Sequence, residues 1–349
     1  MDAETKLIQR IARGTPSELA SGKRRGRAAR ELRSGIGNDG AVLAPTGRTE
    51  WVLSCDAFLE GVHFLRNRHP ADSVGFKSLA RATSDLVAMG ASPRYFLLTL
   101  ALPLHCTGAW LNDFLRGMAK ASRQLGIRLI GGDTKRYESV AISITVLGEI
   151  APRLAVSRSG ARLGDIICVS GTLGAAELGL RMMKDGGDSI PKRGLSGRRS
   201  PLHAHLYPQI RVTLGTWLAR NRVASAMMDI SDGLSTDLNR LCTASRVGAR
   251  IWADRVPCVR IPTARPGKSP KSLTGVKLDP LELALDGGED YELLFTVSPK
   301  NEKKLRRAPG FADLTLIGQI EHGTKVWLVG RDGKVKPLVS LGWDPFRPR

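Results

Sequence analysis

The chain has 349 residues, enough for two domains and a large buried core. Its hydrophobic content of 42% is ordinary for a globular protein. No apolar run could span a bilayer and no secretory signal begins the chain, so we expect a cytoplasmic protein and no membrane partner. The net charge of +20 gathers in loop-like stretches with few aromatic residues, which argues against nucleic-acid binding as the main activity.

The first 34 residues are predicted to form a short amphipathic helix over residues 5–20 and a basic loop over residues 21–30. A Gly-x-Gly-x-x-Gly match follows at Gly35–Gly40. A dinucleotide site needs a strand before this motif and a helix after it, and neither is indicated here. We expect these glycines to let Asp39 and the backbone approach a ligand closely.

The next segment predicts a strand over residues 51–56 that ends at Asp56, with His63 shortly after it. A helix over residues 71–88 carries Asp85 among apolar neighbours. A carboxylate buried alone is costly, so Asp85 needs a partner or a metal ion.

A strand over residues 95–102 and a helix over residues 109–125 come next. A short strand over residues 127–130 then runs into a turn at Gly131–Thr134. At such a turn, glycine backbone N–H groups could face a phosphate while Asp133 holds its metal. A strand over residues 140–150 closes the first of two domains, which we place at residues 35–152.

The second domain, residues 153–349, is predicted to begin with a strand over residues 166–170 and a helix through Met183. Polar loops are expected over residues 184–200 and from the end of a strand at residues 248–254 to about Pro280, the second of them basic over residues 260–277. A helix is expected over residues 208–221. His203 and His205 lie between the first loop and that helix, in a stretch predicted as loop, and are left out of any metal site.

The stretch Ala226–Leu234 carries Asp229 and Asp232 three residues apart, with Ser231 between them. An apolar approach and a helical spacing of leucines predict a strand-to-helix turn, where Ser231 or Asp232 could cap the helix. Clustered carboxylates need a compensating cation or proton, and their hard oxygens suit Mg²⁺.

The remaining segments predict further strands near residues 291–297 and 314–320, followed by a hairpin over residues 326–338. Glu289 follows a Gly-Gly pair just before the first of these strands, and Trp343 stands near the C-terminus. The five cysteines are scattered, which is typical of free thiols.

Acidic residues next to Gly or Ser at element ends therefore recur along a strongly basic chain. This set of carboxylates indicates a site in which several Mg²⁺ ions bind a polyphosphate. Neither a P-loop nor the protein-kinase motifs occur, so phosphoryl transfer here would use a different nucleotide site. The members of the set are Asp39, Asp56, Asp85, Asp133, Asp229 and Asp232.

Seven motifs in this order resemble the thiamine-monophosphate kinase family, within the ATP-binding superfamily of aminoimidazole-ribonucleotide synthetase. The resemblance runs from about Gly35 to Phe346. It implies a two-domain fold of that superfamily, α/β with mixed sheets, whose N-terminal domains pair into a homodimer with ATP near the interface. The motifs are Gly-Ile-Gly-Asn-Asp, Ser-Cys-Asp-Ala-Phe-Leu-Glu-Gly-Val-His-Phe, Ser-Asp-Leu-Val-Ala-Met-Gly, Ile-Gly-Gly-Asp-Thr, Met-Asp-Ile-Ser-Asp-Gly-Leu, Gly-Gly-Glu-Asp-Tyr-Glu-Leu and Gly-Trp-Asp-Pro-Phe.

The resemblance also implies ATP-dependent phosphorylation of thiamine monophosphate to thiamine diphosphate, the last step in making that cofactor, and assigns residues to it. Asp85, Asp133 and Asp232 would be catalytic. ATP contacts would come from Gly132, Asp133, Arg158 and Ser231, and thiamine-substrate contacts from His63, Glu289 and Trp343. Magnesium positions would be Asp39, Ser54, Cys55, Asp56, Asp85, Asp133, Asp229 and Asp232.

One departure from the family pattern is Cys55, which stands where a hydroxyl residue is usual. A thiol is a poor Mg²⁺ ligand, so any contact there should come from its carbonyl oxygen. Two alternatives remain: another ATP-using member of the superfamily with a different acceptor, and a basic nucleic-acid-binding protein on a degenerate enzyme fold.

Overall fold

The computed structural model describes residues 32–34, 38–43, 48–185, 200–261 and 278–346. The helix expected over residues 5–20, the basic loop over residues 21–30 and most of the two later loops lie outside the described residues. Among the described helices, none is both long enough and apolar enough to cross a membrane.

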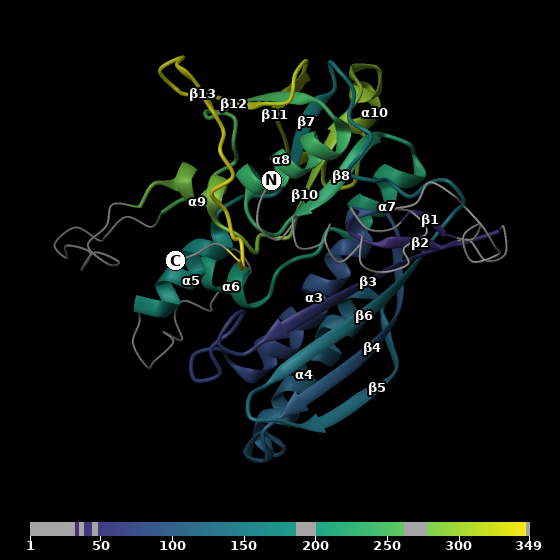
Figure 1. Ribbon diagram of the computed structural model, residues 1–349, viewed down its shortest axis with the longest axis vertical. Coiled ribbons are helices and arrows are strands. Elements are labelled where there is room, and N and C mark those ends of the chain that lie inside the picture. The colour runs from purple at the N-terminus through teal and green to yellow at the C-terminus, as the bar shows by residue number, and fades with distance from the viewer. Residues whose placement is uncertain (1–31, 35–37, 44–47, 186–199, 262–277, 347–349) are drawn as a thin grey trace.

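Six strands form the first sheet, in the order β1-β2-β3-β6-β4-β5 (Figure 1). β4 and β5 run parallel and the other neighbouring pairs are antiparallel, so the sheet is mixed, as expected. The strands are β1 (Leu32–Ser34), β2 (Ala41–Leu43), β3 (Glu50–Leu59), β4 (Ser92–Leu102), β5 (Arg128–Arg136) and β6 (Ala141–Ile150).

Two long helices, α3 (Ala71–Ala88) and α4 (Ala109–Leu125), pack together and cover one face of this sheet (Figure 1). Both have the predicted bounds. α4 ends at Gly126 in the left-handed conformation (φ 68°), which glycine adopts without strain. Along β3, alternate residues such as Val52 and Phe58 are buried beneath the helices, while Cys55 and Leu59 on the opposite face are exposed.

Seven strands form the second sheet, in the order β13-β12-β9-β11-β7-β10-β8. β9 and β12 run parallel and the other pairs are antiparallel. The antiparallel β12–β13 pair confirms the predicted hairpin. The strands are β7 (Ile166–Ser170), β8 (Ala224–Ile230), β9 (Gly248–Trp252), β10 (Glu292–Val297), β11 (Leu314–Glu321), β12 (Val326–Val329) and β13 (Val335–Pro337).

Helix α8 (Leu234–Ser245) packs against β8, β9 and β12 of the second sheet. Five shorter helices complete the described part of the chain, together with single 3-10 turns. The helices are α5 (Ala175–Asp185), α6 (Pro201–Leu206), α7 (Val212–Arg220), α9 (Pro280–Asp286) and α10 (Glu302–Leu305), and the turns are η1 (Leu104–Cys106), η3 (Pro299–Asn301) and η4 (Phe311–Asp313).

The two halves share one hydrophobic core. Its buried residues include Leu79 and Leu86 of α3 together with Met227 of β8 and Phe295 of β10. α3 also contacts β8 directly. Side chains carried by these two elements are therefore held in fixed relation across the junction between the sheets.

Two predicted strand ends are wrong. β3 continues past Asp56 to Leu59, and β5 runs straight through Gly131–Asp133, which was predicted as a turn. In both cases pairing with a neighbouring strand decides the outcome, since β3 pairs with β6 and β5 with β4 over the whole of these stretches.

The helix predicted over residues 208–221 begins only at Val212, and His203 and His205 lie on α6, not in a loop. Ser200 caps α6, because its hydroxyl accepts the His203 N–H, and Pro201 occupies the first helical position. α9 was also missed; Asp279 caps it in the same way and Pro280 opens it.

Candidate functional site

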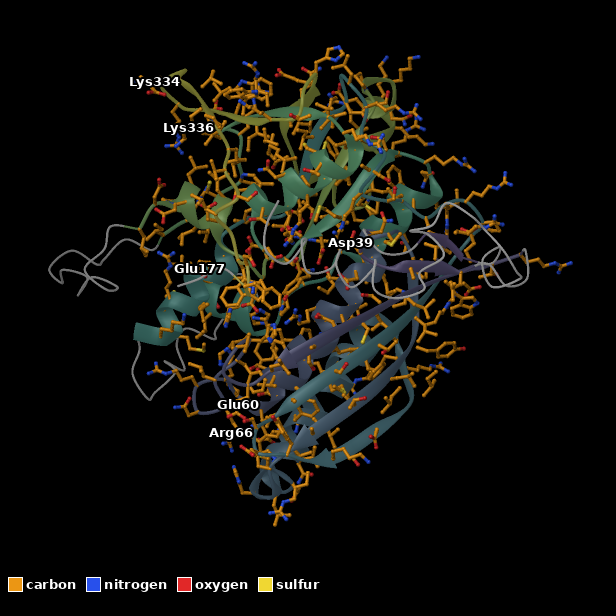
Figure 2. All side chains as sticks on the ribbon, in the orientation of Figure 1. Asp39, Glu60, Arg66, Glu177, Lys334 and Lys336 are labelled. Atoms are coloured by element: carbon orange, nitrogen blue, oxygen red, sulfur yellow. The ribbon has the colours of Figure 1, made fainter. Side chains whose placement is uncertain are left out.

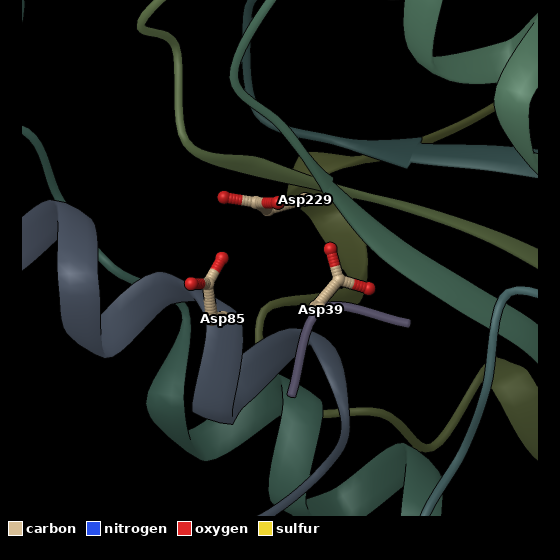
Figure 3. Close-up of side chains that lie close together, drawn as sticks. All are labelled: Asp39, Asp85 and Asp229. Carbon is tan, nitrogen blue, oxygen red and sulfur yellow. The ribbon is translucent and has the colours of Figure 1, made fainter. Parts of the chain in front are cut away.

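Three aspartates from distant parts of the chain converge where the two sheets meet. Asp39 lies just before β2, Asp85 on α3 and Asp229 on β8, and one carboxylate oxygen of each lies within 4.8 Å of the others. Figure 3 shows the three carboxylates pointing toward one another, and Figure 2 places Asp39 between the two sheets. We call Asp39, Asp85 and Asp229 the aspartate cluster.

The aspartate cluster is electrostatically strained without a cation. Desolvation raises the pKa of Asp85 well above its ordinary value, and the charges of Asp229, Asp56 and Asp39 raise it further. Burial, followed by the charge of Asp39, raises the pKa of Asp229 to about 7. A dense set of buried carboxylate oxygens of this kind is the donor set that Mg²⁺ prefers, so the residues fit the metal.

Two hydroxyls orient these carboxylates. Ser54 of β3 donates to Asp85 Oδ2 at 2.5 Å, and Ser84 of α3 donates to Asp229 Oδ2 at 2.6 Å. The second bond joins the helix that covers the first sheet to a strand of the second sheet. Ser54, predicted as a magnesium position, therefore lies beside the aspartate cluster.

Arginines surround the acidic centre. Arg158 binds Asp39 through two bonds, Nη2 to Oδ1 at 2.6 Å and Nε to Oδ2 at 3.1 Å. Arg81 pairs with Asp56: Nη2 donates to Oδ1 at 3.1 Å, and Nε lies 2.6 Å from Oδ2 as an ion-pair contact. Arg240 pairs with Asp232. Sequence reasoning named Arg158 but missed Arg81 and Arg240.

A helical-spacing signal could have found Arg81. It lies four residues before Asp85, so the two share one face of α3. Arg240 also pairs with Asp237, three residues before it on α8, so helical spacing could have found Arg240 but not its second partner Asp232, which lies outside the helix.

The turn that carries Ser231 and Asp232 is built differently from the prediction. Neither residue caps α8; instead their backbone N–H groups donate to Asp237 Oδ2, at 3.1 and 3.0 Å. Burial raises the pKa of the Asp237 carboxyl well above its ordinary value, and repulsion from Asp232 adds to this. Gly233 supplies the left-handed backbone (φ 104°) that lets the chain enter the helix.

The C-terminal segment docks on this turn. Trp343 donates its backbone N–H to the Asp232 carbonyl oxygen at 3.0 Å. Gly342 packs so closely that a Cβ there would lie 1.9 Å from that oxygen. The structure thereby brings Trp343, 38% exposed, beside Ser231 and Asp232 although more than a hundred residues separate them in sequence.

A second polar centre surrounds Glu289. Its Oε2 lies 2.8 Å from Lys77 Nζ and 3.2 Å from His205 Nδ1, and His205 Nε2 lies 3.1 Å from His69 Nε2. Lys77 and His205 are each about 1% exposed. Burial alone would raise the pKa of Glu289, but the charge of Lys77 and the hydrogen bond to His205 hold it well below its ordinary value. We call Lys77, Glu289, His205 and His69 the glutamate network.

The backbone of this segment is unusual. Glu289 and Tyr291 both adopt positive φ angles, 68° and 50°, which cost non-glycine residues on the order of 1–3 kcal/mol each. Their N–H groups donate to the carbonyl oxygens of Ser231 and Ile230, at 2.7 and 2.8 Å. The predicted substrate contact Glu289 is therefore fastened to the turn that carries the predicted ATP contact Ser231.

His63 lies in the turn after β3 and stacks on Phe58, with ring centroids 5.5 Å apart. Its Nδ1 accepts the Leu59 N–H at 3.0 Å. Burial, together with the positive charge of Arg81, lowers the pKa of His63 to about 4, so the ring is neutral at neutral pH. With Nδ1 acting as the acceptor, the proton resides on Nε2.

Three predicted site residues lie away from the aspartate cluster. Gly132 and Asp133 are on β5. Asp133 lies opposite Thr99 of β4, which lies opposite Ser143 of β6, and Ser143 in turn lies opposite Ala57 of β3. Three strand spacings of about 4.8 Å put it roughly 14 Å from β3, on the face that no helix covers.

Cys55 points to that same uncovered face. Its Sγ lies 3.6 Å from Ser143 Oγ and accepts from Thr145 Oγ1 at 3.4 Å. Its thiol therefore faces away from the aspartate cluster, while Ser54 and Asp56 on either side of it face toward α3.

Comparison with known proteins gives consistent matches over most of the chain. The family described as AIR synthase related protein, N-terminal domain, matches residues 37–150, and the corresponding C-terminal domain family matches residues 162–330. Thiamine-monophosphate kinase from Buchnera aphidicola subsp. Acyrthosiphon pisum is 35% identical over 294 residues, 82% of this chain and 84% of that protein.

Thiamine-monophosphate kinase from Aquifex aeolicus is 34% identical over 314 residues, 89% of this chain and 92% of that protein. The solved structure of AaThiL complexed with AMPPCP and TMP superposes with a TM-score of 0.77 at 31% identity. That superposition covers 97% of this chain and 96% of the other. The two-domain fold with mixed sheets expected from the sequence is thus confirmed.

Proposed function

This chain belongs to the thiamine-monophosphate kinase family of AIR synthase related proteins, and we propose that it transfers the ATP γ-phosphoryl group to thiamine monophosphate. The products would be thiamine diphosphate and ADP. The AaThiL complex with AMPPCP, an ATP analogue, and TMP supports ATP as co-substrate and thiamine monophosphate as acceptor. The observation that carries the proposal is that α3 links the two polar centres: Asp85 of the aspartate cluster and Lys77 of the glutamate network lie about two helical turns apart. One centre suits metal-bound phosphate and the other suits the acceptor.

We propose that several Mg²⁺ ions bind at the aspartate cluster and at the nearby Ser54, Asp56 and Asp232. Bound there, the ions would neutralise the phosphate oxygens between which the phosphoryl group passes. The fit rests on the strained carboxylates themselves, whose mutual repulsion a cation relieves.

The chain's own side chains would then do the positioning. Arg158 holds Asp39 in a fixed orientation and, as a predicted ATP contact, presents a guanidinium to the donor phosphates. His63, Glu289 and Trp343 would hold the thiamine end of the acceptor. The acceptor phosphate is already an oxyanion, so direct in-line transfer needs neither a strong general base nor a phospho-enzyme.

We further propose that the protein is a homodimer in the cytoplasm, joined through the uncovered face and edge of the first sheet. Large apolar side chains are exposed there, with Leu97 40%, Leu129 52% and Ile130 56% accessible. Exposed apolar patches and open strand edges are typical of association surfaces. Since Asp133 shares that face, a second copy could bring it to the aspartate cluster that its own chain keeps distant.

The test is an incubation of purified protein with MgATP and thiamine monophosphate, with thiamine diphosphate and ADP both followed by chromatography. We expect the two products in equal amounts and none in EDTA. ADP without thiamine diphosphate would point to a different acceptor. Neither product from folded protein, together with RNA binding that falls steeply with salt, would favour the nucleic-acid alternative.

Direct transfer also predicts no phosphorylated enzyme. If a reaction with labelled ATP is stopped with acid or base during turnover and the protein carries the label, direct transfer is contradicted.

A further inference from the structure

One face of α3 connects the two polar centres. Lys77, Arg81 and Asp85 are spaced four residues apart, so their side chains follow one another along the helix. At 1.5 Å per residue, about 6 Å of helix separates each from the next. Lys77 pairs with Glu289 in the glutamate network and Asp85 belongs to the aspartate cluster, which leaves Arg81 between the two.

Arg81 is held firmly but incompletely satisfied. Its Nε lies 2.6 Å from Asp56 Oδ2, and its guanidinium carbon stands 5.3 Å from the centroid of Phe58, the ring on which His63 also stacks. Within the described residues, Nη2 donates to Asp56 Oδ1, but the buried Nε and Nη1 have no partner in hydrogen-bond geometry. A charged donor without a partner is unfavourable, and the side chain as a whole keeps 16% of its surface accessible.

The surroundings of Arg81 indicate which ligand it would take. It is a permanently charged fork of donors that matches the oxygens of a phosphate. His63 and Glu289, the predicted thiamine contacts, and Asp56 and Asp85, which are expected to hold metal at the donor end, all lie close enough to interact electrostatically with Arg81. An acceptor that spans the two centres would place its phosphate near Arg81.

Building on the proposed function, we propose that Arg81 binds the phosphate of thiamine monophosphate and positions it for attack. A small shift of the guanidinium, of the size side chains make on ligand binding, would turn the Nη1 donor to the entering oxygen. Asp56 and Phe58 would keep the fork in line with the substrate. Arg81 would therefore distinguish the phosphorylated acceptor from unphosphorylated thiamine.

The experiment compares two ligands on each protein by calorimetry: thiamine monophosphate and thiamine. The proteins are wild type, Arg81→Met, Arg81→Lys and the matched control Arg250→Met, which removes an arginine paired with Glu321 on the surface of the second sheet. We expect wild type and control to prefer thiamine monophosphate. Arg81→Met should lose about tenfold or more of that preference while thiamine binding is unchanged, and Arg81→Lys should lose less.

A merely structural role predicts something else. If Arg81→Met weakens both ligands equally, or weakens AMPPCP and leaves the thiamine monophosphate preference intact, the inference is overturned. If wild type itself binds thiamine monophosphate no better than thiamine, the proposed function fails first. Thermal melting identifies a variant that does not fold. If Arg81→Met does not fold, the ratio of thiamine monophosphate affinity to thiamine affinity is measured on Arg81→Lys and Arg81→Gln, and a loss of that preference is again the expected result.

Discussion

Asp85 and Asp232 are two of the predicted metal positions, and a neighbouring side chain fixes each of them. Ser54 orients Asp85, and Arg240 pairs with Asp232. We expect Asp85→Ala and Asp232→Ala to fold, because both positions are needed for charge and not for packing, and to lose at least about a hundredfold in turnover. Circular dichroism and the product assay check this, and near-wild-type turnover in both variants would remove the metal assignment.

His69 predicts an acid-sensitive stability. Burial, followed by the charges of His205 and Lys77, lowers its pKa from 6.5 to about 3. In the unfolded chain this histidine binds a proton near pH 6.5, whereas in the folded protein it does so only near pH 3. Between these two values the unfolded state binds more protons, so the free energy of unfolding decreases as the pH is lowered.

Between pH 7.5 and 5 the loss from this one group is about 2 kcal/mol. Urea unfolding at the two pH values should show a smaller fall for His69→Gln than for wild type. In the control His322→Gln, which changes an exposed histidine, the free energy of unfolding should decrease by the same amount as in wild type. Equal falls in all three proteins would contradict the assignment.

At the scale of an element, the C-terminal segment closes onto the turn before α8. Gly342 lies where a Cβ would meet the Asp232 carbonyl oxygen at 1.9 Å. Gly342→Ala should push Trp343 away from the site, so we expect a several-fold rise in KM for thiamine monophosphate with a smaller effect on ATP. Thermal melting checks that the variant still folds.

The matched control for this segment is Val339→Ala, which shortens an exposed side chain (60% accessible) three residues before Gly342. Its kinetics should match those of wild type. A KM for thiamine monophosphate that is unchanged in Gly342→Ala would separate Trp343 from substrate binding.

At the scale of the whole molecule, the position of Asp133 makes the proposed dimer testable. In a dimer that exchanges this residue, Asp133→Ala and Asp232→Ala each inactivate both sites, but a mixed dimer regains one intact site. Random mixing of equal amounts should therefore recover about a quarter of wild-type turnover. The measurement is turnover after the two inactive proteins are mixed, exchanged and dialysed, with each variant alone as the control. Recovery at background level would place Asp133 in its own subunit's site or outside the reaction.

Much of this protein was determined by local sequence. The apolar spacing fixed α3 and α4 to the residue, because amphipathic periodicity and a glycine stop are local signals. Apolar runs also predicted the strands beside Asp229 and Glu289, although not their exact bounds. The acidic residues themselves were visible because carboxylates beside glycine and serine have few structural reasons to recur.

Tertiary structure decided how those residues meet. Only strand pairing showed that Asp133 and Cys55 face away from the aspartate cluster, since β5 continues through its glycines when β4 supplies a partner. Only packing across the two sheets brought His205 to Glu289 and Arg81 between the two polar centres. Partners that are distant in sequence leave no periodic trace, because their contact depends on how whole elements pack and not on the chain next to them.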